Sequence, residues 1–156
     1  MTDPASTLVE VCDLRAEHLD AVVRIDAQHT GEQKADYWAE VFDRFVGSGP
    51  RDRRVGLAAE EQGRLIGYLL GEVRAFEFGS EACGWIFAVA VDPESLRAHV
   101  ASVLLSEACK RFRDAGVDQV RTMVRRNDVG VMSFFRTNGF EGGSFVQLEM
   151  NLNEQG

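Results

Sequence analysis

The nine residues Trp85-Ile-Phe-Ala-Val-Ala-Val-Asp-Pro93 carry the clearest fold signal in the chain. The apolar run from Trp85 to Val91 has the length of a strand and predicts one that is buried on both faces. Asp92-Pro93 ends this strand, because proline cannot extend a central strand. From about Arg97 the apolar residues change to helical spacing until Gly116, which predicts a helix that stops there. A buried strand followed by a helix indicates an α/β protein.

On both sides of this stretch the sequence predicts further strands and amphipathic helices. Upstream, the expected elements are a strand over Leu8–Leu14, helices over Ala16–Gln28 and Glu32–Val46, a loop over residues 47–52, and a hairpin of strands Val55–Glu60 and Leu65–Arg74. Downstream, they are a strand over Val117–Val124, a short helix over Asp128–Thr137 and a last strand over Phe145–Leu152. The order of elements predicts a mixed α/β single domain over residues 1–156.

The composition excludes several classes of protein. The chain has 156 residues and a formal net charge of −8, which argues against a general nucleic-acid binder with a basic face. No apolar run approaches the roughly 20 residues that span a bilayer, and the N-terminus lacks the regions of a secretory signal. We therefore expect no membrane span and a cytoplasmic location. Three distant cysteines, Cys12, Cys83 and Cys109, lack zinc or disulfide spacing, so we expect reduced thiols and no metal site.

Three features follow one another between Trp85 and Phe140. They are the corner Val91-Asp-Pro93, the helix over Ala101–Ala115, and the stretch Asn127-Asp-Val-Gly-Val-Met-Ser-Phe-Phe-Arg-Thr-Asn-Gly-Phe140. In order and spacing they resemble the GNAT N-acetyltransferase superfamily. In that family a V-x-P-like corner ends the central strand, a Q/R-x-x-G-x-G/A loop opens a helix, and an N-x-x-A-x-x-x-Y-x-x-x-G-F stretch closes the cofactor cleft. The upstream helices and hairpin also match, so the resemblance covers nearly the whole chain.

The resemblance implies an α/β (α+β) fold with a mixed, mostly antiparallel central sheet. Helices would cover both faces, and a central strand would splay from its neighbour. The implied co-substrate is acetyl-CoA or another acyl-CoA, with no metal. The implied partner is an amine acceptor, either a small molecule or a protein amine, and a homodimer is compatible with the sequence.

The loop that would hold the coenzyme A pyrophosphate departs from the family pattern. Helix N-terminal amides bind anions, and a glycine there lets phosphates approach closely. Here His99 replaces that glycine and Leu96 replaces a polar or basic residue, which can block the pyrophosphate or strain the backbone. Arg97 and a protonated His99 are alternative phosphate contacts, and the other interpretation is a loop that only caps a helix. The candidate cofactor residues here are Leu96, Arg97, Ala98, His99, Val100, Ala101 and Ser102.

A second group of candidate cofactor residues follows from the later stretch. Phe135 occupies the position where many family members carry a tyrosine that protonates the leaving thiolate, and phenylalanine has no proton to donate. Water can replace the tyrosine, because a thiolate is a good leaving group. Phe134 and Phe135 also fit an aromatic pair that packs a helix, and Asn127 either contacts the cofactor or caps that helix with Asp128.

The implied reaction is direct attack of a neutral amine on the thioester carbonyl. In this family the backbone of Val89 to Val91 pairs with the pantetheine arm, so the Val89 N–H would polarise the carbonyl. The candidate bases are Glu72 and Glu77, with Glu81 as a weaker candidate; each also fits a solvated surface charge.

In the family that the chain resembles, the N-terminal helical region borders the acceptor site, so the resemblance implies that the acceptor binds there. Tyr37-Trp38 and Trp85 fit either an acceptor pocket or core packing, and we interpret His18 and His29 as surface residues. The sequence therefore favours an acyl-CoA-dependent N-acyltransferase. The alternative is a GNAT-fold binding or regulatory module that has lost coenzyme A binding.

Overall fold

The computed structural model describes residues 8–46, 53–95 and 99–154. The chain divides into two compact units, Met1–Met123 and Val124–Gly156, and each is considered by itself. The expected loop over residues 47–52 and three candidate cofactor residues, Leu96, Arg97 and Ala98, lie outside the described residues.

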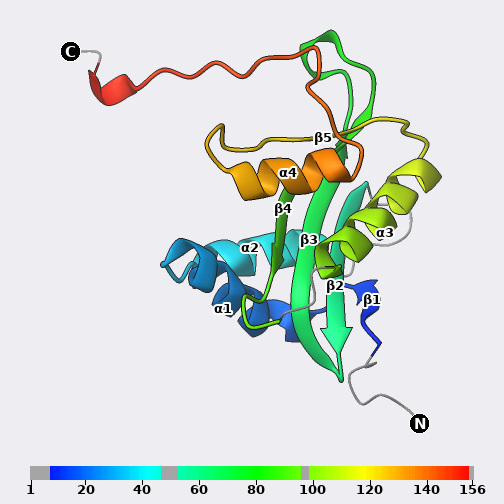
Figure 1. Ribbon diagram of the computed structural model, residues 1–156, viewed down its shortest axis with the longest axis vertical. Coiled ribbons are helices and arrows are strands. Elements are labelled where there is room, and N and C mark those ends of the chain that lie inside the picture. Colours follow the sequence, from blue (N-terminus) through cyan, green and yellow to red (C-terminus); the bar gives the residue numbers. More distant parts are fainter. Residues whose placement is uncertain (1–7, 47–52, 96–98, 155–156) are drawn as a thin grey trace. The chain divides into compact units, whose positions relative to one another are not determined.

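The first unit is built on a five-stranded sheet in the order β1-β2-β3-β4-β5 (Figure 1). Its strands are β1 (Glu10–Asp13), β2 (Arg54–Glu61), β3 (Arg64–Arg74), β4 (Cys83–Val91) and β5 (Val120–Thr122). The first three pairings are antiparallel and only β4 with β5 is parallel. The mixed, mostly antiparallel sheet that the sequence predicts is therefore confirmed.

The β2–β3 hairpin turns where the sequence places it. Gln62 and Gly63 both have positive φ, 54° and 75°. Two successive residues in this region form a turn whose twist matches that of the flanking strands. The turn sets the register in which Ala58 lies opposite Tyr68.

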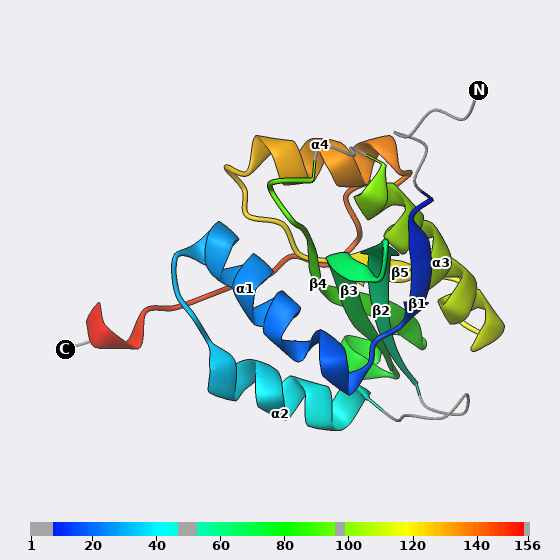
Figure 2. The same ribbon diagram turned by 90° about the horizontal axis from the view of Figure 1, so that it is seen from below.

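One face of the sheet is covered by α1 (Leu19–Thr30) and α2 (Ala35–Phe45), preceded by the short helix η1 (Ala16–His18). Gly31, at φ 80°, ends α1 at the predicted break. In Figure 2 these two helices lie on one side of the sheet and α3 (Val100–Asp114) lies on the other. Helices on both faces are therefore confirmed. The core between the sheet and the first two helices contains Leu14, Val22, Ile25, Trp38, Val41, Phe42, Phe45, Ala58, Leu65, Tyr68 and Leu70.

The opposite face of the sheet carries glycines where α3 packs closely. A Cβ on Gly84 would lie 2.7 Å from the Phe112 ring, and one on Gly71 would lie 2.5 Å from the Trp85 carbonyl oxygen. A Cβ on Gly67 would lie 3.1 Å from Val100, at the start of α3. These glycines let the helix approach the sheet along its length.

The connection between β3 and β4 has an unusual backbone. It contains the short helix η2 (Glu77–Gly79), and Phe76 and Phe78 adopt positive φ of 64° and 55°. Both rings are largely exposed, at 77% and 89%. Positive φ is unusual for a bulky residue and costs conformational energy.

The second unit contains α4 (Val129–Thr137) and the short helix η3 (Leu152–Glu154). The Asp128 side chain accepts a hydrogen bond from the Val131 amide at 3.0 Å and caps α4. The strand predicted over Phe145–Leu152 is wrong: residues 145–151 form no strand, and the apolar side chains there are exposed. Alternation gives a segment one apolar face, but a strand also needs a neighbouring strand to bond with.

Among the described helices, none is long and apolar enough to cross a membrane.

Candidate functional site

The two ends of β4 differ in their neighbours. β5 pairs with Gly84, Trp85 and Ile86 only. Beyond Ile86, β4 continues to Val91 while it remains paired with β3. In the described part of the sheet, the second half of β4 therefore has one strand neighbour and one open edge, which is the splayed arrangement expected from the sequence.

The ladder shows which backbone groups point to this open edge. The Asp92 amide donates to the Ile66 carbonyl at 2.7 Å, beside the pair Gly67–Val91. In an antiparallel ladder, hydrogen-bonded and non-hydrogen-bonded pairs alternate. The pairs Val91–Gly67 and Val89–Leu69 are therefore non-hydrogen-bonded. The N–H and C=O groups of Val91 and Val89 point away from β3.

The end of β4 is anchored by a buried aspartate. Asp92 is 3% exposed, accepts the Glu94 amide at 3.0 Å, and pairs with Arg24 of α1 at 3.2 Å. Burial alone raises the pKa of Asp92, but the Glu94 amide and the Arg24 guanidinium outweigh it, so the pKa lies below its ordinary value. The corner that follows β4 is thus fixed to the first helix.

A second contact joins α1 to the same end of β4. His29, in the last turn of α1, lies with Nε2 2.8 Å from the Val91 carbonyl oxygen. His29 is exposed, as the sequence suggests, but it is also a contact of the open edge. Sequence patterning gave no signal for this role, because the two residues are 62 positions apart.

The described part of the loop region begins at His99. His99 is the N-cap of α3 in an ordinary right-handed helical conformation (φ −88°, ψ −6°), so the predicted backbone strain at this position is not found. Val100 is fully buried, and its side chain lies 3.1 Å from the Cβ position of Gly67, opposite Val91. The start of α3, including Ala101 and Ser102, is thus close to the end of β4. The first amides of such a helix have no acceptor within it.

The candidate catalytic carboxylates lie away from the open edge. Glu72 is opposite Trp85, and Leu69 is opposite Val89. Glu72 is three residues from Leu69 on β3, so it lies about 10 Å along the sheet from the level of Val89. Its carboxylate pairs with Arg74 at 3.3 Å, and Glu77 lies 4.0 Å from the same guanidinium. Glu81 is exposed on the connection to β4. The structure brings Glu72 and Glu77 together at Arg74, but not with Val89.

Aromatic residues gather between α1, α2 and the sheet. Trp38 is buried, and its ring makes edge contacts with Tyr37 at 5.1 Å and Tyr68 at 5.5 Å. Tyr37 is 48% exposed. Trp38 is therefore core, whereas Tyr37 is at the surface. Trp85 instead lies under the Arg74 guanidinium, 5.2 Å from its ring centre.

The remaining cofactor candidates belong to the second unit. Asn127 is exposed, and Asp128 rather than Asn127 provides the side-chain cap of α4. The Phe135 ring packs against those of Phe134 and Phe140, at 5.0 Å in both pairs. The aromatic packing expected of Phe134 and Phe135 is thus present within this unit.

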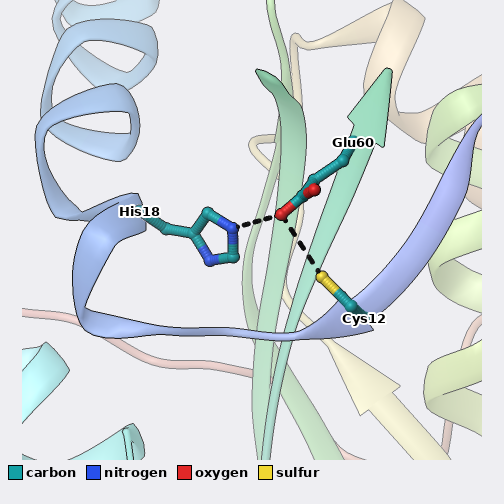
Figure 3. Close-up of side chains that lie close together, drawn as sticks. All are labelled: Cys12, His18 and Glu60. Carbon is teal, nitrogen blue, oxygen red and sulfur yellow. Dashed lines mark hydrogen bonds and ion pairs between the residues drawn. The ribbon is translucent and has the colours of Figure 1, made fainter. Parts of the chain in front are cut away.

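A polar cluster forms where β1, η1 and β2 meet (Figure 3). The Glu60 carboxylate oxygen Oε1 lies 2.6 Å from His18 Nε2, 2.6 Å from Arg15 and 3.6 Å from the Cys12 sulfur. His18 is 5% exposed, so the interpretation of His18 as a surface residue is wrong. Its side-chain partner Glu60 is 42 positions away in the sequence, so patterning could not reveal this contact.

The tautomer of His18 shows what this cluster does. His18 Nδ1 accepts the Arg15 amide at 2.9 Å, so the ring proton is on Nε2, which donates to Glu60. A metal ligand needs a free nitrogen lone pair, and an arginine already occupies this centre. Burial and the nearby Glu60 carboxylate raise the pKa of the Cys12 thiol, which disfavours a thiolate. The cluster therefore joins three elements as a structural contact.

Comparison with known proteins identifies the family of this chain. The sequence model of the acetyltransferase (GNAT) family matches residues 19–140. This chain belongs to that family. No curated protein matches the chain. The recognition of the GNAT superfamily from the corner and its neighbouring motifs is confirmed.

Solved structures share the GNAT fold at low sequence identity. The aminoglycoside N-acetyltransferase AAC(6')-Iy in complex with coenzyme A has a TM-score of 0.82 at 14% identity, covering 97% of this chain and 99% of that one. An acetyltransferase from Trypanosoma brucei has a TM-score of 0.69 at 21% identity, covering 93% and 100%. A transcriptional regulator from Bacillus halodurans has a TM-score of 0.77 at 14% identity, covering 93% and 100%. These likenesses establish the fold, and the family membership supports acyl transfer as the general chemistry.

Proposed function

We propose that the protein is an acyl-CoA-dependent N-acyltransferase that transfers an acetyl or other acyl group to an amine. The observation that carries the proposal is the open edge of β4. Val89 and Val91 direct their backbone polar groups away from β3 there, and β5 stops at the level of Ile86. A pantetheine arm carries two amides, so it can bond with such an edge as a strand does.

The fixed backbone donor at Val89 suits the reaction. The amine nitrogen forms a bond with the thioester carbonyl carbon, and the carbon–sulfur bond then breaks with its electron pair on sulfur. The nitrogen loses one proton and the thiolate gains one, so the products are an amide and free coenzyme A. Negative charge develops on the carbonyl oxygen, and the Val89 N–H would stabilise it without moving.

The pyrophosphate would bind at the start of α3. The amides of Val100 and Ala101 lie at the N-terminus of a 15-residue helix, where unsatisfied N–H groups and the helix dipole favour an anion. His99 adopts a helical conformation, so its side chain does not strain the turn. We keep Leu96, Arg97, Ala98 and Ser102 as cofactor contacts within this proposal, together with Asn127, Phe134 and Phe135.

Proton transfer would rely on water. Phe135 has no proton to donate, and Glu72 and Glu77 both lie near the Arg74 guanidinium, at 3.3 Å and 4.0 Å. We retain these two glutamates as candidate bases only through intervening water, because neither lies near Val89 along the sheet. A thiolate leaving group tolerates protonation by solvent.

The direct test is calorimetric titration of the purified protein with acetyl-CoA and with free coenzyme A, at pH 5.5 and pH 7.5. We expect saturable binding in the micromolar range, tighter at the lower pH if His99 contacts phosphate. Absence of binding at millimolar ligand would overturn the enzyme proposal. It would favour the alternative of a cytoplasmic binding or regulatory module that has lost coenzyme A binding and can act as a homodimer. The departures from the family pattern at Leu96, His99 and Phe135 motivate this alternative.

A further inference from the structure

The C-terminal segment, residues 145–151, exposes an apolar face. Apolar and polar side chains alternate along it, and Val146, Leu148 and Met150 are 79%, 89% and 65% exposed. The Gln147 amide lies 3.5 Å from the Glu149 carboxylate, so these polar side chains share one side. The segment thus has the two faces of a strand but pairs with no strand of the described sheet. Exposed apolar surface of this kind marks interaction sites.

The sheet ends at β5 with a free edge. β5 is the last strand in the order and, within the described sheet, pairs with β4 alone. The Gly84 amide donates to the Gln119 carbonyl at 2.8 Å, so the backbone of Gln119 and, two positions on, of Arg121 faces β4. The N–H and C=O groups of Val120 and Thr122 therefore point to the outer edge. Such an edge can take an added strand from another chain.

The two faces of β5 differ in character. Val120 is opposite Gly84, whose Cβ position lies 2.7 Å from the Phe112 ring of α3. Val120 therefore faces α3, whereas Arg121, the next residue in the strand, faces the other side. A strand that fits this edge needs apolar residues on the α3 side and an acidic residue beside Arg121.

The C-terminal segment meets both requirements in one antiparallel register. With Glu149 opposite Arg121, the neighbouring Met150 lies opposite Val120 and Leu148 lies opposite Thr122. The apolar side chains of the segment then extend the face that α3 covers, and the Glu149 carboxylate lies next to the guanidinium. Pairing in this register uses the outward N–H and C=O groups of β5.

The charges of the two stretches favour this edge over the opposite one. Residues 117–126 carry three arginines and one aspartate, whereas residues 145–154 carry two glutamates and no basic residue. At the other edge of the sheet, β1 begins at Glu10 and ends at Asp13. These acids would repel Glu149.

We propose that two copies of the chain form a dimer in which the C-terminal segment of each copy adds as an antiparallel strand to β5 of the other. Each copy has one free edge and one unpaired segment, so reciprocal exchange pairs both and closes the assembly with two-fold symmetry. Gly142 and Gly143 precede the segment and have open space around them, so the chain can turn toward a partner there. The inference is independent of the proposed function.

Disulfide cross-linking tests both the register and the exchange. Arg121→Cys and Glu149→Cys are introduced into separate chains that are co-expressed and oxidised, so a bond between these positions can form only between two copies. Residues opposite each other in a non-hydrogen-bonded pair are close enough for a disulfide. We expect a covalent dimer whose linked peptides contain positions 121 and 149, identified by mass spectrometry.

Two controls accompany the cross-linking. Asn151→Cys in place of Glu149→Cys keeps the same face but shifts the thiol by two positions, and it should link far less. The unchanged chain controls for its native cysteines. The double variant Arg121→Cys with Glu149→Cys in one chain reveals pairing of the segment with its own sheet. A disulfide within that single chain, with none between co-expressed chains, would overturn the proposal.

Sedimentation velocity measures the strength of the dimer. We expect the unchanged chain to be a dimer at micromolar concentration. Leu148→Pro removes an apolar side chain and the N–H that would bond to Thr122, so the dimer Kd should rise at least about a hundredfold. Gln147→Pro is the matched control, because its N–H would point away from β5, and the Kd should stay nearly unchanged.

A charge exchange tests the contact between Glu149 and Arg121. Glu149→Arg places like charges opposite each other twice in the dimer, and the Kd should rise about fivefold to tenfold. Adding Arg121→Glu should restore most of the affinity. A monomer throughout the micromolar range, or a dimer that Leu148→Pro weakens no more than Gln147→Pro does, would show that the segment does not join two copies.

Discussion

The two halves of β4 have nearly the same apolar composition and opposite surroundings. In the first half, Gly84–Ile86 have strand neighbours on both sides, and Gly84 packs against the Phe112 ring of α3. The second half, Phe87–Val91, is paired with β3 alone and ends in contacts with His29 and Arg24 of α1. The first half uses its backbone for the sheet, whereas in the second half the N–H and C=O groups of Val89 and Val91 point away from β3, and the Val91 carbonyl is contacted by His29.

This difference means that substitutions in the two halves should affect different measurements. Changes in the closed half should reduce the stability of the protein. Changes to the outward groups of the open half should reduce cofactor use and leave stability nearly intact.

The largest effect is expected for proline at position 89. Val89→Pro removes an N–H that points to the open edge, so the ladder with β3 is kept, as for proline on an edge strand. We expect acetyl transfer to fall by about a hundredfold or more, the loss typical of an oxyanion donor. Steady-state rates at saturating acetyl-CoA provide the measurement.

Ala90→Pro is the matched control for this substitution. Ala90 and Tyr68 form a hydrogen-bonded pair in the same ladder, so the proline removes a bond within the sheet. We expect Ala90→Pro to unfold at a clearly lower urea concentration than Val89→Pro. Equal stability of the two variants would show that the assignment of outward-pointing groups is wrong.

The next largest effect concerns the closed half. An added methyl at Gly84 would meet the Phe112 ring at 2.7 to 2.8 Å. We expect Gly84→Ala to lower the free energy of unfolding by about 2–3 kcal/mol, measured by urea denaturation. The cost should shrink in a Phe112→Leu background, whereas Gly142→Ala, with no atom within 4 Å of its Cβ position, should be nearly neutral. An unchanged cost in that background would contradict the role of the ring.

A smaller effect is expected where α1 meets the open half. His29→Ala removes the contact that fixes the Val91 carbonyl, and we expect acetyl-CoA to bind about fivefold more weakly because the edge of β4 that it would pair with is less rigid. His29→Gln keeps a donor of similar reach and should restore most of the affinity. Calorimetry measures both variants. If both variants bind acetyl-CoA equally weakly, the imidazole of His29 does not act as a hydrogen-bond donor to Val91.

The smallest effect is the pH dependence of the Asp92 contact. The folded-state pKa lies below the ordinary value of 3.8, so Asp92 stabilises the protein above about that pH, and the contribution is lost as pH falls through the folded pKa. Asp92→Asn should lower the stability at pH 7 by about 1 kcal/mol and flatten the decline below pH 4. Urea denaturation from pH 3 to pH 7 tests this, and an unchanged acid decline would refute it.

Much of the fold was predictable because its signals are local. The apolar run of β4, the Gln62-Gly63 turn and the stop of α1 at Gly31 each depend on residues that are close in sequence. The prediction of a strand over Phe145–Leu152 failed for the opposite reason. Alternation is a local signal, but a strand also needs a partner strand, which can be distant in the sequence. Pattern alone does not supply the second half of a ladder.

The candidate site divides in the same way. The family resemblance names Val89 and Val91, and the ladder shows that their backbone groups point away from β3. Their role as cofactor contacts stays a prediction, and it needs no particular side chain. The contact between Asp26 and Trp38 was not predictable, because it joins two different helices. Likewise, His18 was placed at the surface because its contact with Glu60 is long-range. Contacts between distant elements are fixed by packing that the sequence does not display.

The connection between β3 and β4 has a consequence for protein engineering. Phe76 and Phe78 place large rings in solvent on a backbone that glycine or asparagine would adopt with less strain. Replacing either ring there would relieve the strain and remove exposed apolar surface without touching the outward groups of β4. This connection is thus the natural starting point for a more soluble and more heat-resistant version of the chain.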